Sequence, residues 1–205
     1  AWKLQTYFSY VKSRVISMIR LLKRFSLVVV AASLAACAGV PVDPNDTSRS
    51  VIFGYIDMDE APTSVDWVFI QQYDGTSDGY SVGADKGLFY HLGVTPGPYQ
   101  VTQFGGSGFL AGEVIYNFPD SGRNETALIV EEPGAYFAGS FGYQKIKTGF
   151  FEQKQFDIQP TTSPTEAEIL QRVLNRMRKN NSEYRHAIAL VEQRMVELQS
   201  VANAE

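Results

Sequence analysis

The sequence predicts a mainly β protein in which an antiparallel β-sandwich is followed by a C-terminal α-helical hairpin. Between residues 51 and 160, aromatic and β-branched residues dominate, and Gly or Pro interrupts the chain roughly every 8–12 residues, as in proteins built from many short strands. Between residues 161 and 205, apolar residues recur at the spacing of an amphipathic helix. Residues 1–50 have neither pattern, so we expect them to lie outside the β-sandwich.

The N-terminal part of the chain has the composition of an export signal. Residues 18–26 carry three positive charges, and an apolar, alanine-rich run follows and ends at Ala36. A basic segment, an apolar segment and small residues, in this order, are typical of a secretory signal peptide. We therefore expect residues 1–36 to be an upstream segment and a signal peptide that starts at Met18. A membrane-spanning helix is the alternative for the uncharged stretch 25–42.

The apolar run ends on the tetrapeptide Leu34-Ala35-Ala36-Cys37, which contains the single cysteine of the chain. This tetrapeptide resembles the lipobox of bacterial lipoproteins. The resemblance implies that the thiol of Cys37 is acylated and that the signal is cleaved between Ala36 and Cys37. Several acyl chains on one residue hold a protein stably at a membrane. A buried core cysteine is the alternative.

Residues 37–50 are expected to be the lipidated cysteine and a flexible tether, because they are rich in Pro, Asp and small polar residues. Fully extended, residues 38–50 span at most about 45 Å. Ala38 follows the cysteine, and by resemblance this residue implies the outer-membrane class of lipoproteins. The protein is therefore expected to be lipid-anchored at the periplasmic face of the outer membrane of a Gram-negative bacterium.

The β region contains nine candidate strands, at residues 51–58, 65–73, 79–83, 88–92, 99–104, 109–118, 126–131, 135–143 and 150–158. The nearly apolar run 65–70 predicts a central strand that is buried on both faces. The glycine-rich stretch 105–108 is interpreted as a flexible turn. The stretch 139–142 is interpreted as part of a strand that packs closely against another backbone.

Residues 87–101 resemble a string found in transthyretin-like and carboxypeptidase-regulatory-like sandwich domains. The shared features are Gly-x-Phe at the start, the Pro96-Gly97 turn and Tyr99; His91 departs from the pattern. The resemblance implies a transthyretin- or immunoglobulin-like sandwich topology. From the residues alone, we expect Phe89 to end one strand and Tyr99 to begin the next, after a turn that uses the conformational freedom of glycine.

The C-terminal segment, residues 161–205, predicts two amphipathic helices. Ser163 and Glu166 are predicted to form a capping box for the first helix, and Ser182 is predicted to cap the second. The apolar positions of the first helix are Ile169, Leu170, Val173, Leu174 and Met177. Those of the second helix are Tyr184, Ile188, Val191, Met195 and Leu198. We expect the helices to pack as a hairpin or on the sandwich rather than in an intermolecular coiled coil, because the seam is short.

The charge of the chain limits its partners. Residues 37–205 hold all 22 acidic residues and 12 of the 18 basic residues, which gives this part a formal charge of −10. Nucleic-acid binding requires basic patches that neutralise phosphates, so we predict no nucleic-acid partner. With one cysteine, an intramolecular disulfide is impossible, and the fold must be stabilised by packing.

Few residues are candidates for chemistry. His91 is predicted to be a satisfied structural histidine in a strand, and His186 lies on a helix flank. No zinc-ligand spacing, nucleophile elbow or phosphate loop occurs in the sequence. The acidic residues Asp57, Asp59 and Glu60 lack the closing acid of a calcium loop and are interpreted as a solvated loop. The sequence therefore predicts no catalytic residue, no metal site and no cofactor.

The expected function is that of a non-enzymatic structural or binding module of the cell envelope, with an envelope protein as its partner. A carbohydrate- or peptidoglycan-binding module is one alternative, in which Tyr73, Tyr80 and Tyr143, near predicted turns, form a binding face. An envelope hydrolase with an unrecognised site is another. The oligomeric state does not follow from the sequence.

Overall fold

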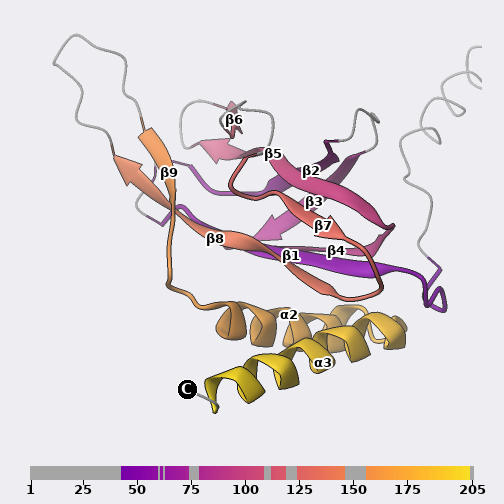
Figure 1. The fold of residues 1–205 in the computed structure, drawn as a ribbon. Helices are drawn as coiled ribbons and strands as arrows, with labels where there is room; N and C mark the ends of the chain where they lie inside the picture. Colours follow the sequence, from indigo (N-terminus) through magenta and orange to yellow (C-terminus); the bar gives the residue numbers. More distant parts are fainter. Residues whose placement is uncertain are drawn as a thin grey trace, which may run out of the picture. The chain divides into compact units, whose positions relative to one another are not determined.

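The computed structural model describes residues 43–59, 61, 63–73, 79–108, 112–118, 124–145 and 156–203. In these ranges the chain forms nine strands and then two helices (Figure 1). The strands are β1 (Ser50–Asp57), β2 (Trp67–Gln72), β3 (Gly79–Asp85), β4 (Leu88–Val94), β5 (Gly97–Gly108), β6 (Gly112–Asn117), β7 (Leu128–Val130), β8 (Ala135–Lys145) and β9 (Phe156–Pro160). The helices are α2 (Glu166–Asn180) and α3 (Arg185–Ala202). The predicted mainly β fold with C-terminal helices is thus confirmed.

The nine strands form one strongly curled sheet, a half-barrel, in the order β6-β5-β2-β3-β4-β1-β8-β9, with β7 paired to β5. Strands β1 and β8 run parallel, with Val51 opposite Ala135, whereas the other described pairs are antiparallel. The prediction of an antiparallel sheet is therefore wrong for this pair. Antiparallel neighbours can be joined by a tight turn, but a parallel pair needs a long connection and has no local signal.

The concave side of the curled sheet encloses a first hydrophobic core, which we call the inner cluster. Its buried residues are Ile52, Ile56, Met58, Val65, Val68, Ile70, Val82, Phe89, Val94, Tyr99, Val101, Phe104, Phe118, Val130, Ala138 and Phe141. Aromatic rings contact one another within it; the ring of Phe118 lies edge-on to Phe104 and to Phe141. Five of the chain's aromatic residues are therefore explained as buried members of this core.

The helices cover the outer face of the sheet around β1 (Figure 1). A second core lies between the helices and the sheet. The buried residues of this outer cluster are Val51, Phe53, Tyr55, Leu88, Leu92, Ile169, Leu170, Val173, Leu174, Met177 and Val191. The other apolar seam positions of α3 pack against it. The prediction left open whether the helices pack as a hairpin or on the β region; in the structure α2 and α3 contact each other and both contact β1. Strand β1 supplies both clusters, because alternate residues of a strand point to opposite faces.

The N-terminus of α2 differs from the prediction by two residues. Thr165, not Ser163, is the N-cap: its hydroxyl accepts the Glu168 backbone N–H at 3.4 Å, and the Glu168 carboxylate accepts the Thr165 backbone N–H at 2.8 Å. Both pairs have the same three-residue spacing, so the sequence cannot separate them. Glu166 instead accepts a hydrogen bond from Arg194 of α3 at 2.9 Å. The contact between the helices thus decides which capping box forms.

The start of α3 also differs from the prediction. Its N-cap is Tyr184, whose side chain makes no capping hydrogen bond, so the prediction of Ser182 as the cap is wrong. The ring of Tyr184 packs against the outer cluster. Burial of an aromatic ring therefore positions the first turn of this helix, in place of a polar cap.

Two glycine-rich stretches have opposite outcomes. Residues 105–108 lie inside β5, so the predicted flexible turn is wrong; a Cβ on Gly106 would come within 2.0 Å of the Ser64 carbonyl oxygen. This glycine lets a neighbouring backbone approach closely. In the stretch 139–142, the predicted close packing is confirmed, because a Cβ on Gly54 would come within 2.9 Å of the Gly139 carbonyl oxygen.

Strand β2 is buried mainly on one face. It begins at Trp67; Val68 and Ile70 are buried, whereas Trp67 and Phe69 are half-buried, so the prediction of a strand covered on both faces is wrong. The outer side chains lie on glycines of neighbouring strands: a Cβ on Gly105 would come within 2.5 Å of the Trp67 ring. Aromatic rings thus cover this face where a second layer of protein was expected.

The turn at Pro96-Gly97 separates β4 from β5, as predicted. Phe89 lies inside β4 rather than at its end, because the strand continues to Val94 and Phe89 packs in the inner cluster. Tyr99 is fully buried. Its hydroxyl accepts a hydrogen bond from the Gln72 amide at 2.9 Å, so the buried ring also has a polar partner.

Candidate functional site

The predicted lipidation and cleavage residues, Cys37 and Ala36, lie outside the described residues. Residues 43–49, which the sequence assigns to the tether, form hydrogen-bonded turns just before β1. There, hydrogen bonds from Ser48 and Arg49 lower the pKa of the half-buried Asp46 to about 2. These turns end at Ser50, so the sheet begins directly behind them.

The three candidate binding tyrosines do not gather on one exposed face. Tyr80 and Tyr143 are half-buried and pack against the inner cluster. The ring of Tyr80 lies 4.2 Å from the ring of His91 and 6.1 Å from that of Tyr99, centroid to centroid. Tyr73 is half-buried just beyond the end of β2, where its backbone N–H is bonded to Pro98. Their proposed role in binding stays a prediction.

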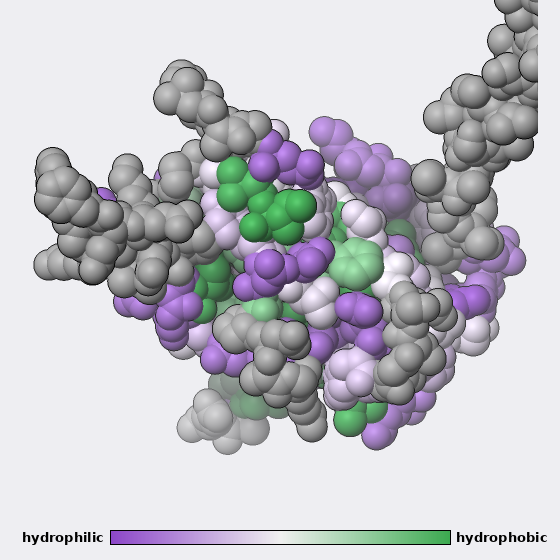
Figure 2. Space-filling model, turned by 90° about the horizontal axis from the view of Figure 1, so that it is seen from above, coloured by the Kyte–Doolittle hydropathy of each residue, from purple (hydrophilic) through white to green (hydrophobic). Residues whose placement is uncertain are grey.

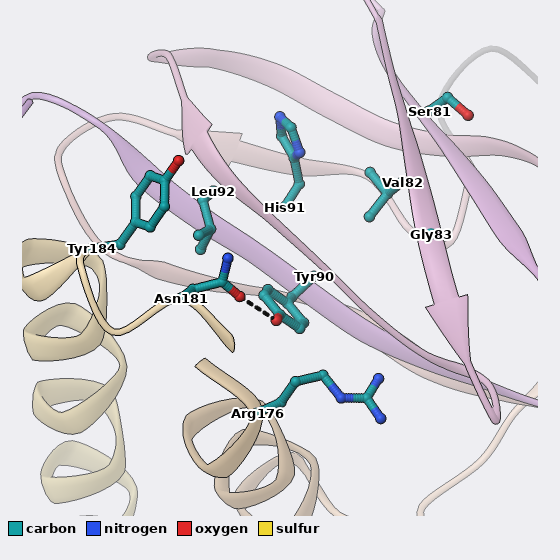
Figure 3. Close-up of a pocket in the computed structure, with 9 residues that line it drawn as sticks. All are labelled: Ser81, Val82, Gly83, Tyr90, His91, Leu92, Arg176, Asn181 and Tyr184. Carbon is teal, nitrogen blue, oxygen red and sulfur yellow. Dashed lines mark hydrogen bonds between the residues drawn. The ribbon is translucent and has the colours of Figure 1, made fainter. Parts of the chain in front are cut away.

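A pocket opens where β3 and β4 separate, and we call it the split pocket (Figure 3). The two strands pair at Ala84–Phe89 and Asp85–Leu88, whereas β3 pairs with β2 along five residues, from Gly79 to Gly83. The pocket has a volume of about 380 Å³. Its described lining residues come from β3, β4, α2 and the turn between the helices: Ser81, Val82, Gly83, Tyr90, His91, Leu92, Arg176, Asn181 and Tyr184.

Polar side chains at the lower side of the split pocket fasten the helices to the sheet. The hydroxyl of Tyr90 donates to Oδ1 of Asn181 at 2.8 Å, the bond drawn in Figure 3. The guanidinium of Arg176 pairs with Asp85 at the end of β3. These contacts hold two polar groups at the pocket wall while leaving the pocket open.

His91 lines the other side of the split pocket, and Figure 3 shows it projecting from β4 away from Tyr90 and Asn181. Its Nε2 atom is buried and has no hydrogen-bond partner among the described residues, so the prediction of a satisfied histidine is wrong. Burial lowers the pKa of His91 to about 4. The ring is therefore neutral at pH 7, and its role in the fold is to stack on Tyr80.

A second hollow, the amide groove, lies on the outer face of β2, β5 and β6, with a volume of about 460 Å³. Figure 2 views the molecule from the side opposite the helices, and on this side hydrophilic residues are interspersed with hydrophobic ones. The residues that line the groove are Phe69, Gln71, Gln100, Thr102, Gln103, Asn117, Phe118 and Asn124. None of these residues, taken from the part of the chain that the structure describes, is ionisable, and five carry a side-chain amide.

Sequence reasoning did not find the amide groove, and a β-bulge explains why. The register between β2 and β5 shifts between Phe69 and Ile70, so that Phe69 faces Gln103 while Gln71 faces Gln100. Residues three apart lie on opposite faces of a regular strand, and only an extra residue brings both onto one face. The signal available in the sequence was the number of Gln and Asn residues in the predicted strands. Amide residues such as Asn are depleted in strands, so their presence there calls for a reason.

Within the described ranges, no group of three or more His, Cys, Asp or Glu side chains is placed to hold a metal ion. No helix in this part of the chain is long and apolar enough to cross a membrane. Searches of protein-family models, curated proteins and solved structures found no match to this chain.

Proposed function

We propose that this protein is a lipid-anchored, non-enzymatic binding module of the bacterial cell envelope that holds an extended segment of a partner protein in the split pocket. The anchor is supported by the lipobox-like tetrapeptide that ends at Cys37 and by the signal-like segment before it. By its resemblance to outer-membrane lipoproteins, the module faces the periplasm. The acidic charge of residues 37–205 favours solubility and repels anionic lipid, which keeps the module off the membrane surface.

The separation of β3 and β4 is the observation that carries the binding proposal. Beyond Phe89, strand β4 is paired with β1 on one side, and its other edge faces the pocket. An exposed strand edge binds an extended peptide through its backbone, and side chains beside it add specificity.

The side chains of the pocket suit a peptide. Tyr90 and Tyr184 offer apolar ring surface with a polar tip, and Ser81 adds an exposed hydroxyl. The guanidinium of Arg176 and the amide of Asn181 are held in place by their contacts with Asp85 and Tyr90. Preorganised groups of this kind lower the entropic cost of binding.

We also propose that the curled sheet is a variant of the transthyretin- or immunoglobulin-like sandwich. The support is the inner cluster, which is formed by strands from both halves of the sheet order, such as Val68 of β2 and Phe141 of β8. The resemblance around Tyr99 agrees with this proposal. The departures from it are the parallel pair β1–β8 and the short β3–β4 pairing, which joins the two halves into one sheet.

The anchor is tested with Cys37→Ser. The wild-type protein should fractionate with the outer membrane and accumulate as a larger precursor when lipoprotein signal peptidase is inhibited with globomycin. The variant should lose both behaviours. If Cys37→Ser is processed and fractionates as the wild type does, the anchor proposal is wrong.

The split pocket is tested with a photo-crosslinking amino acid at Ser81, which is exposed at the pocket, in cells of the native host. The matched control carries it at Val196, which is 64% exposed on α3. We expect a specific protein adduct from position 81 only, mapped by mass spectrometry to one extended segment of the partner. Equal adducts from both positions, or none from position 81, contradict the proposal.

A further inference from the structure

We propose that the amide groove is a binding site for an uncharged glycan segment. This site lies apart from the split pocket, since the two share no lining residue. The inference therefore goes beyond the proposed function and does not depend on a protein partner. It rests on the chemistry of the lining residues, on the hydrogen bonds that orient them and on the half-buried ring of Phe69.

The lining of the groove suits hydroxyl groups. Each side-chain amide presents a carbonyl oxygen that accepts and an NH₂ group that donates. The vicinal hydroxyls of a sugar ring also donate and accept, so one amide can bind two of them. Because the described lining residues carry no formal charge, they offer a charged ligand no opposite charge to offset its desolvation. The groove thus favours a neutral polyhydroxylated ligand.

A row of side chains crosses three strands of the groove. Phe69 of β2 is opposite Gln103 of β5, which is opposite Asn117 of β6. The Gln103 Nε2 donates to the Asn117 Oδ1 at 2.9 Å. This bond leaves the Gln103 carbonyl as an acceptor and the Asn117 NH₂ group as a donor, beside each other. The pair therefore presents a fixed acceptor and donor to a ligand.

A second row lies beside the first. Gln71 of β2 is opposite Gln100 of β5. The Gln100 Oε1 accepts the Asn124 backbone N–H at 3.1 Å, and the Asn124 Nδ2 donates to the Val101 carbonyl at 2.7 Å. These bonds orient the Gln100 NH₂ group and fix Asn124. Gln100 and Asn124 are thus oriented before any ligand arrives.

The ring of Phe69 supplies an apolar surface at the groove. It is half-buried and rests on Gly79, where a Cβ would come within 2.5 Å of the ring. The C–H face of a sugar ring packs on an aromatic ring while its hydroxyls turn to polar neighbours. An aromatic ring opposite a fixed amide pair is the combination that such a ligand needs. A small amide or alcohol would bind the amide pair but would leave the aromatic ring unused.

The test measures binding of neutral oligosaccharides to the full-length lipidated protein in a zwitterionic detergent without a sugar headgroup. The probes are tetrasaccharides of β-linked glucose and of β-linked N-acetylglucosamine, with a tetrasaccharide of uronic acids as the charged comparison. We expect saturation transfer from protein to at least one neutral probe and at least tenfold weaker binding of the charged one. If neither neutral probe binds the folded protein, the proposal is overturned.

The decisive variants remove the amide pair. Gln103→Ala and Asn117→Ala should each weaken binding of the neutral probe about tenfold, since each leaves a partner hydrogen bond unmade. Gln171→Ala is the matched control, because the Gln171 Nε2 donates to the Asn175 Oδ1 at 3.1 Å on the exposed face of α2. All three are surface substitutions, and circular dichroism verifies the fold. Equal binding by the groove variants and the control contradicts the proposal.

Discussion

The inner and outer clusters share β1 but are built in different ways. The inner cluster comes entirely from residues of the curled sheet and the loops between its strands, and it contains polar atoms such as the Tyr99 hydroxyl. The outer cluster joins the sheet to α2 and α3, and about half of it is supplied by helical residues such as Val173 and Met177. Phe53 of β1 is fully buried under the helices, while its neighbour Ile52 is fully buried in the inner cluster.

This difference teaches what the C-terminal helices do. A strand buried on both faces requires a layer on each side, and the helices provide the second layer for β1. Without them, Val51, Phe53 and Tyr55 would form an apolar patch on the outside of the sheet. The helices are therefore part of the fold. The inner cluster, by contrast, depends on the curl of the sheet, which brings distant strands face to face.

The largest effect is expected from truncating one phenylalanine in each cluster. Phe53→Ala and Phe89→Ala should each lower the free energy of unfolding by about 3–5 kcal/mol, because each ring is fully buried. Native-state hydrogen exchange should distinguish the two variants. In Phe53→Ala, the amides of α2 should exchange before those of β5, whereas in Phe89→Ala both should be affected alike. Val196→Ala, on the exposed side of α3, should change stability by less than about 0.5 kcal/mol.

Identical exchange of α2 in the two phenylalanine variants would contradict the division into two clusters. A loss of less than about 1 kcal/mol for either variant would contradict the packing itself.

A smaller loss of stability is expected at acid pH, because the ring of His91 is buried in the neutral form. Its folded-state pKa of about 4 lies below the value of about 6.5 in an unfolded chain. The unfolded chain therefore takes up a proton that the folded protein excludes. Stability should be full above pH 6.5 and fall by up to about 3 kcal/mol as the pH drops to 4. Urea denaturation at pH 7, 5.5 and 4.5 measures this slope.

His91→Phe should remove the slope between pH 6.5 and 4 while keeping the ring stack with Tyr80. Tyr80→Phe is the control, because it keeps both the histidine and the stack and should retain the slope. An unchanged slope in His91→Phe would show that other groups cause it.

The smallest loss of stability is expected from variants at the start of α2, the helix that supplies most of the helical residues of the outer cluster. Thr165→Ala should cost about 1 kcal/mol, because it removes the hydroxyl that accepts the Glu168 N–H. Ser163→Ala should cost less than about 0.5 kcal/mol, since its side chain does not cap the helix. Thermal unfolding of both variants compares the two capping boxes directly. The reverse order of the two losses would favour the box predicted from the sequence.

Within the ranges that the structure describes, the sequence by itself determined the approximate place of the strands and the apolar faces of both helices. The reason is that these features are local: alternation, turn residues and helical spacing are visible within a few residues. Ile169, Val173 and Met177 recur at four-residue intervals, and all three are fully buried. The turn at Pro96-Gly97 likewise lies between β4 and β5, where local turn residues predict it.

Only the tertiary structure decided what depends on distant partners. Glu166 pairs with Arg194, so the capping box moved to Thr165; β1 lies parallel to β8, which no local turn dictates. The bulge opposite Phe69 and Ile70 brought Gln100 and Gln103 to one face and so created the amide groove. Each of these contacts joins segments that are far apart in the chain. Its contribution to stability therefore arises only once the chain has folded and brought the segments together.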